Sequence, residues 1–218
     1  MIVQIYEVQN PEEAKELERL GVDHIGVVVG KGEHPNELSF EKAKAIFKVL
    51  SKNTKKVALF LSNKLGELYE IIEEVQPDIL HLCALPQDIT AEDVRKIKQK
   101  FPDVKIMRTI PVIDEKSIDL AKEYEGIADY LLLDSHRKGD FQVGATGKTH
   151  NWQISKKIVE TVKTPVILAG GLGPDNVRKA IEIVKPAGVD SKTKTDRGDG
   201  KGKDLGKVKE FVKRAKQN

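Results

Sequence analysis

The feature of this sequence that most constrains its fold is a regular alternation between short apolar runs and longer charged stretches. The apolar runs are rich in Val, Ile and Leu, as expected of strands buried on both faces, and the charged stretches repeat apolar residues at helical spacing. Neighbouring parallel strands need a crossover connection, which is usually a helix. The alternation therefore predicts an α/β fold with a parallel sheet covered by helices.

Eight strand and helix pairs are expected. The strands are predicted at Ile2–Tyr6, His24–Val29, Lys56–Leu61, Ile79–Leu82, Lys105–Thr109, Tyr130–Leu133, Pro165–Leu168 and Gly188–Asp190. The helices are predicted at Pro11–Leu20, Phe40–Ser51, Leu65–Glu74, Ala91–Lys100, Glu115–Tyr124, Ser155–Thr161, Asp175–Val184 and Leu205–Lys216.

Eight such pairs in 218 residues lie near the short end of the range for a (β/α)8 TIM barrel. An open doubly wound sheet is the alternative, but it ordinarily has fewer strands. No linker, low-complexity segment or strong internal repeat divides the chain. We therefore expect residues 1–218 to form a single (β/α)8 barrel domain.

Charge and composition narrow the classes of partner. Lys and Arg number 37 against 34 acidic residues, and they are spread through the chain, so we expect no nucleic-acid partner. No apolar run approaches the roughly 20 residues of a membrane span, and the first residues do not resemble a signal peptide. The lone cysteine, Cys83, cannot form an internal disulfide or a thiolate metal cluster. We expect a cytoplasmic protein without a membrane partner, either a monomer or a homodimer.

A glycine-rich segment follows the seventh expected strand. It reads LAGGLGPDNV at 168–177 and includes Gly170 and Gly171 just before a predicted helix. In barrels the common phosphate site is built by the loops after strands seven and eight together with a helix N-terminus. The sequence therefore predicts a phosphate site here. The alternative is a tight turn in which Asp175 or Asn176 caps the helix.

A second glycine-rich segment, GATGKT at 144–149, follows the sixth strand and contains Gly144 and Gly147. It resembles a P-loop only superficially, because the spacing lacks the four-residue insert of that motif. We expect a loop that closes over substrate instead.

Polar residues end or interrupt several of the apolar strands. Asp134 follows the sixth strand, where it would act as a general acid or base at the barrel mouth or simply cap the loop. His81 and Cys83 are two residues apart on the fourth strand and so share one side, as Gln4 and Tyr6 do on the first. His81 and Cys83 would form an acid–base or nucleophilic pair, or Cys83 is an inert buried residue.

One cation is a candidate ligand for the substrate. Arg108 lies near the end of the fifth strand, where a guanidinium would hold a carboxylate or phosphate. The histidines and acids show no tight metal-ligand spacing, so we expect neither a metal nor another cofactor.

These residues together resemble the phosphoribosylanthranilate isomerase family of tryptophan biosynthesis, over nearly the whole chain. The matching segments are LLLDS at 131–135, GATGKTHNW at 144–152 where the family has a similar GGTG segment ending in Asp-Trp, LAGGL at 168–172, and GVD at 188–190 with GKD at 202–204. The resemblance implies a barrel isomerase for an Amadori rearrangement of a phosphorylated aminosugar. It also implies that Asp134 is the general acid and that the backbone after strands seven and eight holds the phosphate.

The chain departs from the family pattern at four places. The family carries a cysteine base in a KICG motif on the first strand, whereas this chain reads QIYE at 4–7 and has Tyr6 in place of the cysteine. An unperturbed tyrosine, with a pKa of about 10, is a poor base at neutral pH. The family's QLHG on the fourth strand is here HLCA at 81–84. The family's arginine after the second strand is not evident in GKGEHP at 30–35, and its SSGVE segment after the eighth strand is replaced by KTKTD at 192–196.

These departures predict a remodelled substrate site. Lys192 or Lys194, which flank Thr193, would supply a point charge to the phosphate, or they form a solvated basic loop. Three functions stay open: an isomerase of this family with Cys83, Tyr6 or Glu7 as base; a divergent sugar-phosphate isomerase, epimerase or lyase that uses His81, Cys83 and Asp134; and a non-catalytic paralogue that binds a phosphorylated metabolite.

Overall fold

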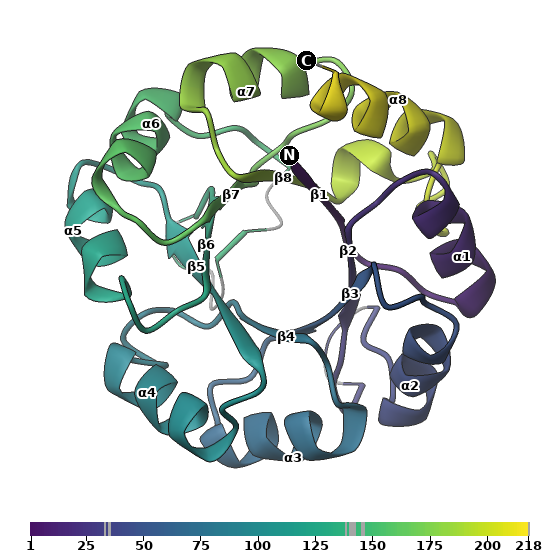
Figure 1. Cartoon of the computed structure of the whole chain (residues 1–218), viewed down its shortest axis with the longest axis horizontal. Coiled ribbons are helices and arrows are strands. Elements are labelled where there is room, and N and C mark those ends of the chain that lie inside the picture. The colour runs from purple at the N-terminus through teal and green to yellow at the C-terminus, as the bar shows by residue number, and fades with distance from the viewer. Residues whose placement is uncertain (33, 35, 138, 140–142, 145–146, 218) are drawn as a thin grey trace.

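The computed structural model describes residues 1–32, 34, 36–137, 139, 143–144 and 147–217. Within these residues eight parallel strands pair in chain order and close into a barrel, because β1 pairs with β8 as well as with β2. Figure 1 looks down this barrel and shows the helices as an outer ring, with the N-terminus beside β8 and the C-terminus between α7 and α8. The predicted (β/α)8 architecture is confirmed.

The strands and helices lie close to the predicted ranges. The strands are β1 (Ile2–Ile5), β2 (His24–Val28), β3 (Lys55–Phe60), β4 (Ile79–Leu82), β5 (Lys105–Pro111), β6 (Tyr130–Asp134), β7 (Val166–Leu168) and β8 (Gly188–Ser191). The helices are α1 (Pro11–Arg19), α2 (Phe40–Lys48), α3 (Leu65–Val75), α4 (Ala91–Lys100), α5 (Lys116–Glu123), α6 (Trp152–Thr161), α7 (Val177–Val184) and α8 (Leu205–Lys216), with a 3₁₀ turn at Thr193–Thr195.

Two helices, α6 and α7, begin at residues other than those predicted. α6 starts three residues earlier than predicted because the side chain of Asn151 accepts from Gln153 N. α7 starts later than predicted, and Asn176 makes no side-chain cap. Its side chain is engaged instead by the preceding glycine loop: Oδ1 accepts from Gly173 N at 2.9 Å and Nδ2 donates to Gly171 O at 3.0 Å. The proposed helix-capping role of Asp175 or Asn176 is therefore wrong, and Asn176 shapes the loop.

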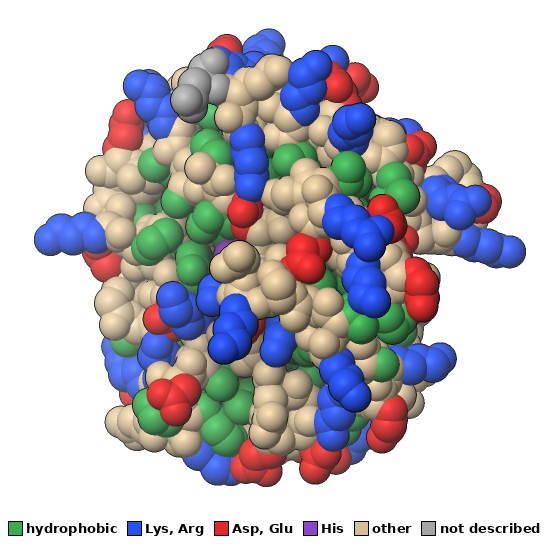
Figure 2. Space-filling view, turned by 45° about the vertical axis from the view of Figure 1, so that its right-hand side comes forward, with side chains coloured by type: hydrophobic (Ala, Val, Ile, Leu, Met, Phe, Trp, Pro, Cys, Tyr) green, Lys and Arg blue, Asp and Glu red, His purple; other side chains and the backbone are tan. Residues whose placement is uncertain are grey.

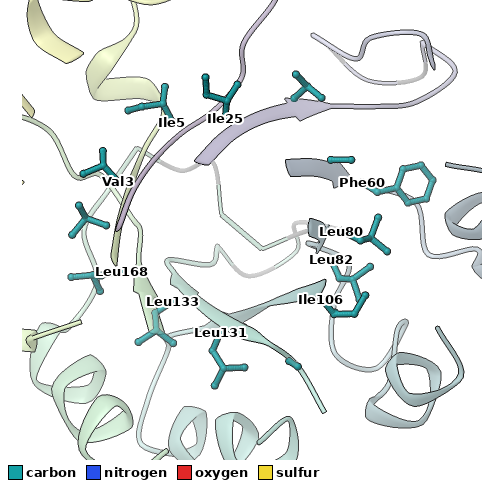
Figure 3. Close-up of a cluster of buried hydrophobic side chains, with 14 of the residues drawn as sticks. Val3, Ile5, Ile25, Phe60, Leu80, Leu82, Ile106, Leu131, Leu133 and Leu168 are labelled. Atoms are coloured by element: carbon teal, nitrogen blue, oxygen red, sulfur yellow. The ribbon is translucent and has the colours of Figure 1, made fainter. Parts of the chain in front are cut away.

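Alternation along the strands separates two apolar layers. The larger core lies between the barrel and the helices, and Figure 3 shows strand residues such as Val3, Ile5, Leu80, Leu82 and Leu133 that belong to it. Successive strand side chains point to opposite faces, so the alternate residues fill the barrel interior. The interior cluster contains Tyr6, Val57, Ile79, Met107, Leu132, Ile167 and Ala169. Buried polar residues of β1, β2, β4 and β8 therefore face one another inside the barrel.

Candidate active site

A cavity of about 310 Å³ opens at the carboxyl ends of the strands. Part of its wall is apolar, formed by Val28, Leu59, Leu61, Leu132 and Val143. The polar and charged groups that line it are Tyr6, Glu7, His34, Asn36, His81, Cys83, Asp134, Asp190 and Lys192. This is the end at which (β/α)8 enzymes keep their active sites. The structure thus brings all four residues expected to be catalytic, Tyr6, His81, Cys83 and Asp134, to one cavity.

Asp134 ends β6 with its carboxylate held in a fixed orientation. Oδ1 accepts from Ser135 N at 2.7 Å and from Ser135 Oγ at 3.2 Å. Gly144 packs directly on the same carboxylate, because a Cβ atom at Gly144 would overlap Oδ2, and its φ of +98° suits glycine. Its N–H donates to Ser135 O at 3.0 Å. Gly144 therefore limits where the Asp134 carboxylate can lie, and its expected part in a loop that closes over substrate stays a prediction.

Tyr6, His81, Cys83 and Thr109 form a closed hydrogen-bonded group inside the barrel. The Tyr6 hydroxyl lies 2.5 Å from His81 Nδ1, and His81 Nε2 lies 2.6 Å from Thr109 Oγ1. Cys83 Sγ is 3.4 Å from both His81 Nε2 and Thr109 Oγ1. Both ring nitrogens of His81 are thus engaged by groups of the protein.

Burial shifts the pKa values of this group away from the physiological range. Desolvation raises the pKa of the Tyr6 hydroxyl well above its usual value and that of the Cys83 thiol to about 12. Desolvation, together with the positive charge of Arg108, lowers the pKa of His81 to about 3. At neutral pH the tyrosine and the thiol therefore stay protonated and the imidazole stays neutral. The group is well suited to ordering the barrel interior.

Asp190 on β8 is a cavity residue to which the sequence analysis gave no role. It is 8% exposed, and its Oδ1 accepts from Gln4 Nε2 at 3.1 Å. Gln4 in turn is fixed by His24, whose Nδ1 lies 3.0 Å from Gln4 Oε1. Burial and the nearby Asp134 carboxylate raise the pKa of Asp190 to about 8, against the lowering effects of the Gln4 hydrogen bond and the positive charge of Lys203. The sequence signal was available, because Asp190 ends an apolar strand at the barrel mouth as Asp134 does.

The two glycine-rich loops and the loop after β8 converge beside this cavity. Gly170 and Gly171 have φ of +82° and +60°. A Cβ atom at Gly171 would lie 2.8 Å from Gly147 O, and one at Gly147 would lie 3.7 Å from the Thr193 methyl group. In the described part of the chain the N–H groups of Gly171 and Leu172 donate no main-chain hydrogen bond. These features make a concave backbone surface of the kind that binds anions.

The lysines after β8 lie on two sides of this surface. Lys192 lines the cavity, and its Nζ is 3.5 Å from Glu7 Oε2. Lys194 is exposed and packs over the glycine loop, since a Cβ atom at Gly173 would lie 2.6 Å from Lys194 Cβ. Thr193 is exposed at the start of the 3₁₀ turn.

Arg108 does not reach the cavity, and the role proposed for it is wrong. Alternation along β5 turns Met107 and Thr109 into the barrel and Arg108 outward, toward the helices. The guanidinium is fully buried, with Nη1 donating to Leu82 O at 3.0 Å and to Ala84 O at 2.7 Å, and it lies 5.2 Å from the centre of the Tyr124 ring. Arg108 joins β4, β5 and the helix layer.

His150 is a second residue that the sequence analysis missed. Its Nε2 lies 2.7 Å from Ser155 Oγ, while Nδ1 is buried without a hydrogen-bond partner. A Cβ atom at Gly170 would lie 2.8 Å from that Nδ1 and 3.2 Å from Asp134 Oδ1, so both side chains border Gly170. Burial lowers the pKa of His150 to about 4, so the imidazole is neutral at pH 7.

Two further findings concern the described residues only. They contain no group of three or more His, Cys, Asp and Glu side chains arranged to hold a metal ion, and none of their helices is long and apolar enough to cross a membrane. Figure 2 shows basic and acidic side chains interspersed over one face of the molecule. The loop expected to close over substrate includes residues 140–142 and 145–146, which lie outside the described residues.

Comparison with known proteins gives one consistent result. The family model described as N-(5'phosphoribosyl)anthranilate (PRA) isomerase matches residues 4–214. The N-(5'-phosphoribosyl)anthranilate isomerase of Aquifex aeolicus is 39% identical over 215 residues, covering 98% of each chain. The crystal structure of the phosphoribosyl anthranilate isomerase from Thermotoga maritima superimposes with a TM-score of 0.83 at 26% identity, covering 99% of each chain. Another structure of such an isomerase, in complex with reduced 1-(o-carboxyphenylamino)-1-deoxyribulose 5-phosphate, gives a TM-score of 0.82 at 25% identity and 99% coverage of each chain.

Proposed function

This chain belongs to the N-(5'-phosphoribosyl)anthranilate isomerase family, and from that premise we propose how its residues carry out the Amadori-type isomerisation of a phosphorylated aminosugar. The reaction needs a general acid that protonates the ring oxygen of the ribose and a general base that removes the proton at C2. The sequence and cavity geometry support separate residues for these two tasks.

Asp134 is the general acid in this proposal. The single observation that carries the assignment is its fixed carboxylate at the cavity, where Ser135 holds Oδ1 and Gly144, which lacks a Cβ atom, packs directly on Oδ2. An oriented acid loses little entropy when it meets the substrate. The unpartnered Nδ1 of His150 beside it is suited to bind a substrate hydroxyl.

The substrate phosphate binds in this proposal where the loops after β6, β7 and β8 meet. The main-chain N–H groups of Gly171 and Leu172 would donate hydrogen bonds to the phosphate. Gly170 and Gly147 shape the surrounding surface, and Lys194, which packs over the glycine loop, would add positive charge. The structure of a relative in complex with a ribulose 5-phosphate derivative supports a phosphorylated ligand for this fold. The apolar wall of the cavity would receive the aryl ring.

Neither of the other two candidate functions is favoured. A divergent sugar-phosphate isomerase, epimerase or lyase would use His81, Cys83 and Asp134 in new roles, but His81 and Cys83 are engaged in the hydrogen-bonded group with Tyr6 and Thr109. A non-catalytic paralogue would not need two differently placed carboxylates, Asp134 and Asp190, at the cavity. We place the protein in the cytoplasm as a single-domain monomer or homodimer, which stays a prediction.

The test is a fluorescence assay with freshly generated phosphoribosylanthranilate, comparing the wild-type protein with Asp134→Asn at matched concentration. Loss of a general acid typically lowers turnover by about 10²- to 10⁴-fold. We expect a loss of this size with an unchanged circular dichroism spectrum. Equal turnover in the variant would remove Asp134 from the mechanism, and no turnover in the wild-type protein would contradict the proposed substrate.

A further inference from the structure

The chain lacks the family's first-strand cysteine, so its general base must be another group at the cavity. Tyr6 occupies that position directly after β1, but its hydroxyl is hydrogen-bonded to His81 and remains protonated at neutral pH. Cys83 is also protonated, with burial raising the pKa of its thiol to about 12. His81 has both nitrogens engaged. None of these three residues is a suitable base.

Asp190 is placed as such a base requires. It lies on β8 next to the start of the β1 loop, where Tyr6 N donates to Ser191 O at 3.2 Å. Gln4 is its register partner on β1 and holds Oδ1 at 3.1 Å. Within the described chain Oδ2 has no hydrogen-bond partner, and Asp190 lines the cavity with Asp134. One oxygen thus fixes the carboxylate, and the other is available to substrate.

Glu7 is the competing carboxylate, but it is engaged at the rim of the cavity. Asn36 Nδ2 donates to Glu7 Oε2 at 2.9 Å, and Lys192 Nζ lies 3.5 Å from the same oxygen. Both contacts engage Oε2 of Glu7 with groups of the protein. Asp190, by contrast, is buried and has no cation bonded to its carboxylate among the described residues.

We propose that Asp190 is the general base of this isomerase, taking the proton from C2 of the ring-opened substrate. This inference rests on the proposed function. Asp134 first gives its proton to the ring oxygen as the C1–O bond breaks, which leaves a protonated imine at C1. Asp190 then removes the C2 proton, and the electron pair of the C–H bond forms the C1–C2 double bond of an enolamine.

The same two carboxylates complete the reaction. Asp190 returns its proton to C1, and the C2 hydroxyl proton passes to Asp134 as the C2 carbonyl forms. Each carboxyl group ends in the protonation state in which it began, so no further reactant is needed. The product is the aminoketose phosphate.

Electrostatic coupling supports this division of roles. The negative charge of Asp134 disfavours ionisation of Asp190, while the hydrogen bond from Gln4 and the positive charge of Lys203 favour it. Tyr6 and Cys83 are the other titratable groups that interact with Asp190. Two coupled carboxylates share one proton over a range of pH, because their like charges oppose double ionisation. A proton on Asp134 removes this repulsion and so favours ionisation of Asp190, while burial, the larger effect, keeps its pKa raised. A carboxylate with a raised pKa is the stronger base once it is ionised.

The experiment uses the full-length protein with phosphoribosylanthranilate and three variants. Asp190→Asn keeps the side-chain volume, Asp190→Gly leaves space for a small carboxylate, and Glu7→Gln is the matched change at the competing residue. We expect Asp190→Asn to lower kcat by about 10³-fold or more. Glu7→Gln is expected to lose far less, and added sodium formate is expected to raise the rate of Asp190→Gly at least tenfold in a saturable manner, without accelerating Asp190→Asn.

Every outcome decides between the possibilities. Asp190→Asn within tenfold of wild-type kcat would refute the proposal, as would a loss in Asp190→Gly that formate does not restore, because a purely structural aspartate gives no saturable rescue. A larger loss of kcat in Glu7→Gln than in Asp190→Asn would refute the proposal and transfer the role to Glu7. If the wild-type protein shows no turnover, the proposed function fails and the assignment of Asp190 fails with it.

Discussion

The contact between Gly144 and Asp134 gives a sharp test of how closely the acid must be positioned. In Gly144→Ala the new methyl group would lie 3.1 Å from Asp134 Cγ and overlap Oδ2. Ordinary carbon contacts begin at about 3.5 Å, so the carboxylate or the loop must move by several tenths of an ångström to about 1 Å. Misplacement of about 1 Å costs roughly 10²-fold in rate.

The same substitution strains the backbone, and this second effect needs its own control. Gly144 has a φ of +98°, and alanine at a positive φ costs about 1 to 2 kcal/mol. For a domain of this size that cost lowers Tm by about 2 to 8 °C. Gly126→Ala carries a comparable strain, with a φ of +77°, but a Cβ atom there has no neighbour within 4 Å. It therefore separates strain from displacement of the carboxylate.

The assay measures kcat and KM for phosphoribosylanthranilate together with Tm for both variants. We expect both variants to lose a few degrees of Tm and only Gly144→Ala to lose about 10²-fold in kcat. KM should change less than kcat, because Gly144 contacts the Asp134 carboxylate, whereas the N–H groups proposed to bind the phosphate belong to Gly171 and Leu172. If Gly144→Ala keeps a kcat within a factor of three of Gly126→Ala, the position of Asp134 does not limit the reaction and our reasoning is refuted.

Two further predictions concern the phosphate loops and the barrel interior. In Gly171→Ala the new Cβ atom would lie 2.8 Å from both Gly147 O and the Lys148 carbonyl carbon, so the loop must shift. Loss of a hydrogen bond from this loop to the charged phosphate costs about 1.5 to 3 kcal/mol. We therefore expect KM to rise by about 10- to 150-fold, with a smaller change in kcat. An unchanged KM would show that phosphate does not bind there. Burial lowers the pKa of His24 from 6.5 to about 4. Between these two pH values the unfolded chain therefore binds more protons than the native protein. Acidification through this range lowers the free energy of unfolding, and His24 contributes at most about 3 kcal/mol to that loss. Urea unfolding at pH 7 and pH 4.5 should show a smaller loss for His24→Gln than for the wild-type protein, and equal losses would contradict the pKa shift.

The sequence by itself determined the architecture and part of the site. The alternation of apolar runs with amphipathic segments is enough to predict eight strand and helix pairs, because a strand buried on both faces and a helix buried on one face require different spacings of apolar residues. The polar residues Tyr6, His81, Cys83 and Asp134 stood out for the same reason, since each interrupts or ends an apolar strand. Their common location in one cavity follows from the parallel arrangement of the strands.

Only the tertiary structure decided what these residues can do. Whether Arg108 faces the substrate depends on the register of β5, and a change of one position turns a ligand into a buried link to the helix layer. The pKa values of Tyr6, His81 and Cys83 depend on burial among residues from β1, β4 and β5, which are far apart in the chain. Asp190 and Asp134 lie 56 positions apart in the sequence, and their coupling exists only because the closed barrel brings β6 and β8 to the same cavity.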